Sequence, residues 1–90
     1  MNGRLILIEM PVILRYQGYK FFFFSNEGIP REPIHIHVRK GETTAKIWID
    51  PSVVLAESYG LTSGQQKELL DVVNEHKNFI IRSWHEHFGK

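Results

Sequence analysis

The sequence predicts an α+β domain in which an antiparallel sheet of four or five strands carries one long C-terminal helix on one face. β-Branched and aromatic residues dominate as far as Ile49, whereas a helical pattern dominates after Leu61. The first half also divides into short segments separated by glycine or proline turns, which is typical of hairpins. Strands followed by a helix are the order expected of an α+β fold.

The first predicted hairpin covers residues 12–16 and 19–25. Gln17-Gly18 between them supplies a tight turn. Four consecutive phenylalanines, residues 21–24, make the second of these strands apolar on both faces, so we expect it to be covered at least in part on both sides. Residues 26–33 contain a glycine and two prolines and are predicted to form a loop.

The second predicted hairpin shows clean alternation, with Lys40-Gly41-Glu42 as its turn. In residues 34–39 and 43–49, one set of side chains is apolar and the other mostly polar or charged. The apolar set is Ile34, Ile36, Val38, Ala45, Ile47 and Ile49, and the opposite set is His35, His37, Arg39, Thr44, Lys46 and Trp48. Asp50-Pro51 ends the last strand. Residues 53–60 fit a fifth short strand or a single helical turn, and we favour the strand.

The C-terminal third predicts one helix that begins at Thr62-Ser63 and ends at Gly89. Ser63 followed by Gln66 fits a capping box, in which each side chain satisfies a backbone N–H of the first turn. A stripe at three- and four-residue steps is formed by Leu69, Val73, His76, Ile80, Trp84 and Phe88. At 1.5 Å per residue, such a helix spans roughly 37 Å and can cross a whole sheet.

Length and composition limit the classes of protein that this chain can belong to. Ninety residues make one domain, which we place at residues 10–90, with residues 1–9 as an N-terminal extension. The absence of cysteine excludes disulfides and thiolate metal sites. No segment approaches the ~20 apolar residues that cross a bilayer, so we expect a cytoplasmic protein with no membrane partner. The net charge of +1 means that a nucleic acid would have to bind a local patch.

The local feature that most specifically indicates a functional site is the segment His35-Ile36-His37-Val38-Arg39. Spacing of two on a strand puts both imidazoles on one face, about 7 Å apart. The pair fits a polar binding surface, a general acid–base pair, or half of a metal site. Two histidines are too few for a closed zinc site, and a third ligand would have to come from loop carboxylates at Glu27, Glu32 or Asp50, so we expect no metal and no cofactor. His85 and His87 lie roughly 200° apart around a helix and cannot share a ligand.

The face of the sheet opposite the helix is predicted to be the functional surface. If the helix covers the apolar set, the other face carries Lys20, Phe22, Phe24, His35, His37, Arg39, Lys46 and Trp48. Aromatic side chains among basic ones can stack nucleobases and hold phosphates. The same composition fits a dimer or partner interface, which the near-zero net charge favours.

From Met10 to Gly89 the chain resembles the family of small bacterial proteins known as domain of unknown function 4160. The resemblance is carried by six motifs and one tryptophan, namely residues 10–15, 19–24 and 25–27, the loop 28–33, His35-Ile36-His37-Val38, Ala45-Lys46-Ile47-Trp48, and Trp84. It implies that a second small protein is encoded nearby, in an arrangement similar to toxin–antitoxin pairs. It implies no particular activity.

Together these observations predict a protein- or nucleic-acid-binding module of a toxin–antitoxin-like pair. Its partner would be the second small protein, a second copy of the chain, or RNA or DNA. The binding residues expected from the strands and the adjoining loop are Asn26, Glu27, Arg31, Glu32, His35, His37, Arg39, Lys46 and Trp48. The alternative is a metal-independent ribonuclease, with His35 and His37 as acid and base and Arg39 or Lys46 stabilising the developing charge.

Overall fold

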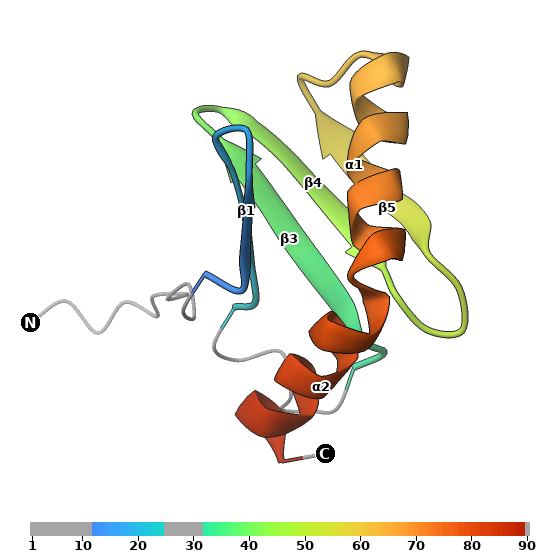
Figure 1. The fold of residues 1–90 in the computed structure, drawn as a ribbon. Coiled ribbons are helices and arrows are strands. Elements are labelled where there is room, and N and C mark those ends of the chain that lie inside the picture. The colour runs from blue at the N-terminus through green and yellow to red at the C-terminus, as the bar shows by residue number, and fades with distance from the viewer. Residues whose placement is uncertain (1–11, 25–31, 90) are drawn as a thin grey trace, which may run out of the picture.

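The structure is a computed structural model that describes residues 12–24 and 32–89. It has one antiparallel five-stranded sheet with two helices on one face (Figure 1). The elements are β1 (Leu14–Tyr16), β2 (Tyr19–Phe22), β3 (His35–Lys40), β4 (Thr43–Trp48), β5 (Val54–Tyr59), α1 (Ser63–Glu75) and α2 (Lys77–Phe88). The predicted α+β class is confirmed, and residues 53–60 contribute a fifth strand.

The sheet is a meander in which each strand pairs with the next one along the chain, in the order β1-β2-β3-β4-β5. Gln17 and Gly18 both have positive φ, 46° and 86°, as a two-residue hairpin turn requires. Compared with the predicted strands, β3 is shifted by one residue and β4 ends one residue earlier, but a hydrogen bond of 2.9 Å from the Ile49 N–H to the Ile34 carbonyl extends the β3–β4 ladder to the predicted ends. A β-bulge opposite Lys46 and Ile47 interrupts the β4–β5 register.

The hydrophobic core lies between the sheet and the helices. Its buried members are Phe21, Phe23, Ile36, Val38, Ala45, Ile47, Ile49, Leu69, Val72, Val73, Ile80 and Trp84. These residues include five of the six positions predicted for the apolar face of the second hairpin, the sixth, Ile34, being partly buried against the cluster. Phe22 lies outside this cluster and is nevertheless only 2% exposed, so the phenylalanine run is covered on both sides as predicted.

The prediction of one long helix is only partly matched, because the helical segment breaks at His76. That residue has φ −111° and ψ 20°, and its N–H is shared between the Val72 and Val73 carbonyls at 3.2 and 3.1 Å. Its Nδ1–H donates to the same Val72 carbonyl at 2.9 Å, so the side chain enters the backbone ladder. His76 fits the spacing of the apolar stripe but marks the junction of α1 and α2, which take different directions (Figure 1).

The N-terminal cap of α1 lies one residue earlier than the sequence predicted. The Gln65 N–H donates to Thr62 Oγ1 at 3.1 Å, and the Thr62 N–H donates to Gln65 Oε1 at 2.9 Å. This is a complete capping box on Thr62 and Gln65, and the predicted pair of Ser63 and Gln66 is wrong. Gln66 Nε2 instead donates to Ser58 Oγ of β5 at 3.0 Å.

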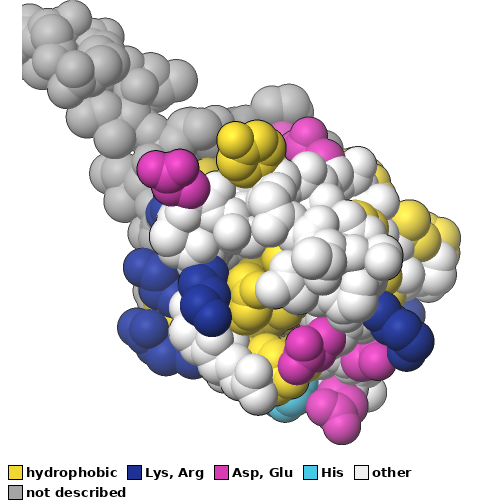
Figure 2. Space-filling view, turned by 90° about the horizontal axis from the view of Figure 1, so that it is seen from above, with side chains coloured by type: hydrophobic (Ala, Val, Ile, Leu, Met, Phe, Trp, Pro, Cys, Tyr) yellow, Lys and Arg dark blue, Asp and Glu magenta, His cyan; other side chains and the backbone are white. Residues whose placement is uncertain are grey.

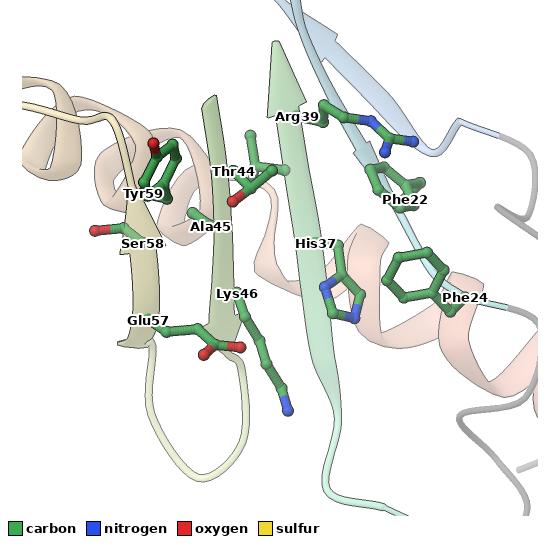
Figure 3. A pocket seen from close by; sticks show the side chains of 11 residues that line it. Phe22, Phe24, His37, Arg39, Thr44, Ala45, Lys46, Glu57, Ser58 and Tyr59 are labelled. Carbon is green, nitrogen blue, oxygen red and sulfur yellow. The ribbon is translucent and has the colours of Figure 1, made fainter. Parts of the chain in front are cut away.

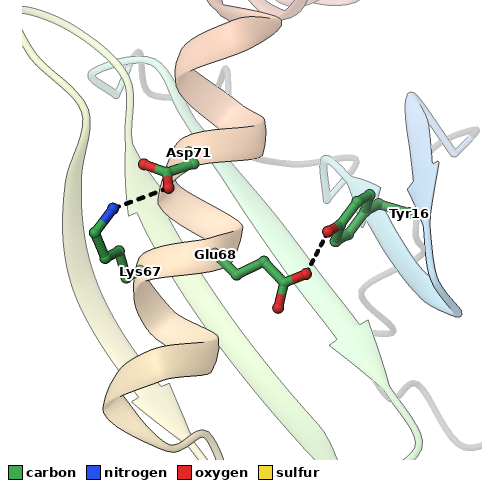
Figure 4. Close-up of polar contacts among 4 residues, drawn as sticks. All are labelled: Tyr16, Lys67, Glu68 and Asp71. Carbon is green, nitrogen blue, oxygen red and sulfur yellow. Dashed lines mark hydrogen bonds and ion pairs between the residues drawn. The ribbon is translucent and has the colours of Figure 1, made fainter.

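Polar side chains also tie α1 to the first strand (Figure 4). The Tyr16 hydroxyl donates a hydrogen bond to the Glu68 carboxylate. That bond raises the pKa of Tyr16 above its usual value of 10, because ionisation would break the bond and would also place a second negative charge beside the carboxylate. Lys67 and Asp71 form an exposed ion pair of 3.0 Å one turn apart on α1.

In the described part of the chain, neither helix is long and apolar enough to cross a membrane.

Candidate functional site

The sheet face that points away from the helices, here called the open face, carries its side chains in three rows that cross the strands. Residues directly opposite each other in an antiparallel pair share a face, so the register defines each row. The first row is Arg15, Lys20, Arg39, Thr44 and Tyr59, the second is Phe22, His37, Lys46 and Glu57, and the third is His35, Trp48 and Val54. The predicted residues of the second hairpin thus come together on one surface.

A groove of about 300 Å³ lies on this face between β2 and β5 (Figure 3). Phe22 and Phe24 line it on one side, and Glu57 and Tyr59 line it on the other. Between these walls the groove is lined by His37, Arg39, Thr44 and Lys46, from the two central strands. The groove is therefore apolar at one wall, and between the walls it combines these polar side chains with Val38 and Ala45.

His37 is held by aromatic packing at the base of the apolar wall. Its ring stacks on Phe22 with a centroid separation of 5.8 Å and an interplanar angle of 27°, and lies 4.4 Å from the Phe24 centroid. Both rings come from the phenylalanine run. Alternate residues of this run point to opposite sides, so Phe21 and Phe23 lie in the core and Phe22 and Phe24 line the groove. His37 remains partly exposed and can contact a solute in the groove.

His35 is buried, so of the two imidazoles predicted for the polar binding surface this one is not exposed. Its exposed fraction is 0%, and its Nδ1–H donates to the Pro33 carbonyl at 2.8 Å. Trp48 and Trp84 both approach the ring with centroid separations of 5.3 Å, and Glu32 Oε1 lies 3.9 Å from Nε2. The two imidazoles are neighbours at 5.1 Å, but only His37 lines the groove.

Two of the open-face cations lie over aromatic rings. The Arg39 guanidinium is 5.2 Å from the Phe22 centroid, and Lys46 Nζ is 4.5 Å from the Trp48 centroid. Such cation–π contacts orient the two side chains along the surface. Figure 3 shows the Arg39 side chain extending toward Phe22, and the Lys46 side chain extending away from Thr44.

The remaining predicted residues are less well placed. Asn26, Glu27 and Arg31 lie outside the described residues, whereas Glu32 is described and approaches His35. Within residues 12–24 and 32–89, no three side chains of the kinds that ligate metals come together. His85 and His87 are exposed on α2, and His87 contacts the edge of Phe23 at 5.9 Å.

Five residues of the three rows are absent from the predicted open face, namely Arg15, Thr44, Val54, Glu57 and Tyr59. Thr44 was assigned to the correct side but not to the site. Arg15 and Tyr59 lie on the two edge strands, whose registers against β2 and β4 decide which row they join. Alternation within each strand could have placed them on a face, but not opposite particular partners.

Fold and site together define a class of small α+β protein, in which a meander sheet is covered by helices on one face and lined with aromatic and basic side chains on the other. Residues 18–85 match the family described as Domain of unknown function (DUF4160), and the chain belongs to this family. Comparison with curated proteins and with solved structures finds no match. The family resemblance expected from the sequence is thereby confirmed.

Proposed function

We propose that this protein is a non-catalytic binding module and that its open face holds an anionic partner. One observation carries the proposal, namely the charge of the three rows: they contain Arg15, Lys20, Arg39 and Lys46, against Glu57 as the acid. The chain as a whole has a net charge of +1, so the open face is far more positive than the average surface. In the view of Figure 2, most of the visible Lys and Arg side chains likewise gather along one side of the molecule.

The environment of the histidines supports binding over catalysis. A metal-independent ribonuclease needs an acid and a base that both reach the substrate. His35 is enclosed by two tryptophans and bonded to Pro33, whereas His37 alone of the pair lines the groove. The geometry therefore favours a surface that binds over a pair that transfers protons.

The family resemblance supplies the cellular setting of the proposal. We place the chain in the cytoplasm of a bacterium, as one member of a toxin–antitoxin-like pair with a second small protein encoded nearby. In this setting the open face is the surface through which the chain acts, and the helices support it from behind.

The test compares two lysines on opposite faces of the molecule, the partly buried Lys46 and the exposed Lys67. Lys46→Ala removes a cation from the groove, and Lys67→Ala removes one from the outer side of α1, where it pairs with Asp71. Both variants lose one positive charge, so they separate a local patch from net charge. We expect Lys46→Ala to elute from heparin, a polyanion, at a clearly lower salt concentration than the wild type. Lys67→Ala should change the eluting salt concentration by only a small fraction of that amount.

Equal elution of both variants would contradict the proposal, because binding would then follow net charge alone. A second measurement addresses catalysis: the pure protein is incubated with mixed RNA, with and without a chelator. Cleavage that His37→Ala abolishes and the chelator leaves unchanged would establish the ribonuclease alternative instead.

A further inference from the structure

The first row of the open face, here called the cation row, crosses all five strands. Arg15 on β1 lies opposite Lys20 on β2, which lies opposite Arg39 on β3. The row continues through Thr44 on β4 to Tyr59 on β5. With strands ~4.8 Å apart, the three cations span about 10 Å and the whole row about 19 Å.

The chemistry of the row matches a chain of anions and not a single one. Three cations in a line, with no acid among the five positions, can each contact a successive negative group. A compact anion would be held by cations that converge on one point, whereas these three project from three separate strands. The Arg39 guanidinium lies 5.2 Å from the Phe22 centroid, and this contact orients it in the row.

The row ends on a solvent-exposed aromatic ring. Tyr59 is 70% exposed, the most exposed large hydrophobic side chain in the described part of the chain. It stands at the rim of the groove, opposite Thr44 (Figure 3). An exposed ring at the end of a line of cations is the arrangement by which sheet surfaces stack an unpaired base while holding its backbone.

We infer that the open face binds single-stranded nucleic acid, whose phosphates follow the cation row across the strands while a base stacks on Tyr59. This inference rests on the proposed function and names the partner that the open face holds. A duplex is excluded from the same mode, because its bases are stacked on each other and cannot reach Tyr59. An acidic protein segment would use the cations but would not need a planar ring at the end of the row.

The experiment measures fluorescence anisotropy of labelled 12-nucleotide oligo(U) and oligo(dT), with a 12-base-pair duplex and a 12-residue oligoglutamate as competitors. We expect the single strands to bind and the duplex and the peptide to compete poorly. Three phosphate contacts give a slope of log K against log salt of roughly −2, since each contributes about −0.7 on a single strand.

Variants then locate the site. Arg15→Ala, Lys20→Ala and Arg39→Ala should each flatten the salt slope by about 0.7, because each removes one phosphate contact. Tyr59→Leu should weaken binding by roughly tenfold with an unchanged slope, and Tyr59→Phe should restore it, since stacking needs the ring and not the hydroxyl. Lys67→Ala and Phe79→Leu, at exposed positions on the helices, are matched controls that should bind like the wild type.

Three results would overturn the inference. Binding that the row variants and Tyr59→Leu leave unchanged would place the nucleic-acid site elsewhere, and oligoglutamate that competes as well as oligo(U) would identify an acidic protein segment as the partner. If no oligonucleotide binds while Lys46→Ala still elutes early from heparin, this inference fails and the proposed function stands. If heparin also fails to distinguish Lys46→Ala from Lys67→Ala, both fail.

Discussion

Trp84 on α2 should be the largest single side-chain contribution to the stability of this domain. It is 2% exposed and packs its indole against Phe23 at 5.2 Å, Phe88 at 4.5 Å and His35 at 5.3 Å between ring centroids. It therefore connects the second helix with both the core side of β2 and the buried end of β3. Truncation to alanine removes all three contacts and leaves a cavity that rigid neighbours cannot fill.

The expected cost of Trp84→Ala is about 3–5 kcal/mol, as for other fully buried tryptophans. A domain of this length has a total free energy of unfolding of roughly 5–13 kcal/mol, so the variant should lose about a quarter of its stability or more. Urea denaturation followed by circular dichroism measures this loss. With a typical slope of about 2 kcal/mol per molar, the midpoint should fall by roughly 2 M.

Trp48→Ala is the matched control, because the same side chain is removed from the open face. Trp48 is half-buried and contacts Lys46 and His35, so its removal should lower the midpoint much less. If Trp84→Ala does not fold, Trp84→Phe keeps a ring in the same cluster and should give a smaller but measurable shift. A variant order in which Trp48→Ala unfolds the protein and Trp84→Ala is harmless would show that the core and the open face have been assigned the wrong way round.

Two further predictions concern the contacts that hold α1. The pKa of Tyr16 is raised because its hydroxyl donates to Glu68, so this bond stabilises the fold up to the usual tyrosine pKa of 10 and is lost as the pH rises through the higher native pKa. The free energy of unfolding should therefore fall more steeply above pH 10 in the wild type than in Tyr16→Phe. Urea midpoints of the two proteins that run parallel across that range would contradict this. Thr62→Ala should lower the free energy of unfolding by about 1 kcal/mol, because it removes the cap that satisfies the Gln65 N–H, and Ser63→Ala should lower it clearly less. The reverse order in thermal melts would show that Ser63 is the capping residue, as expected from the sequence.

Much of the open face follows from the sequence, because the period of two along a strand is a local property of the backbone. Each strand sorts its own side chains before it meets a partner, so the alternation in residues 34–39 and 43–49 suffices to place His37, Arg39, Lys46 and Trp48 on one surface. The turn at Gln17-Gly18 is local in the same sense. Its two residues adopt positive φ within a hairpin whose strands are adjacent in the chain.

Several features that the sequence did not reveal depend on residues distant along the chain. His35 alternates like a surface residue, yet it is buried because Trp84, 49 positions later, covers the end of β3. His76 fits an apolar stripe, and the break that it marks lets α2 bring Trp84 and Phe88 onto Phe23. Such packing is decided by which elements meet in space, and a pattern within one element carries no information about it.

The cation row shows the same division within a single feature. Alternation assigns a face to each cation separately, but the row exists because four registers align Arg15, Lys20 and Arg39 with Tyr59 at the far edge. Register is set by turn geometry and by packing against the helices, and a shift of one residue in any pair would send the side chains of that strand to the other face. The sequence by itself therefore determined the kinds of side chain that each face of the sheet presents. Only the tertiary structure decided which of these side chains are aligned with one another across the strands.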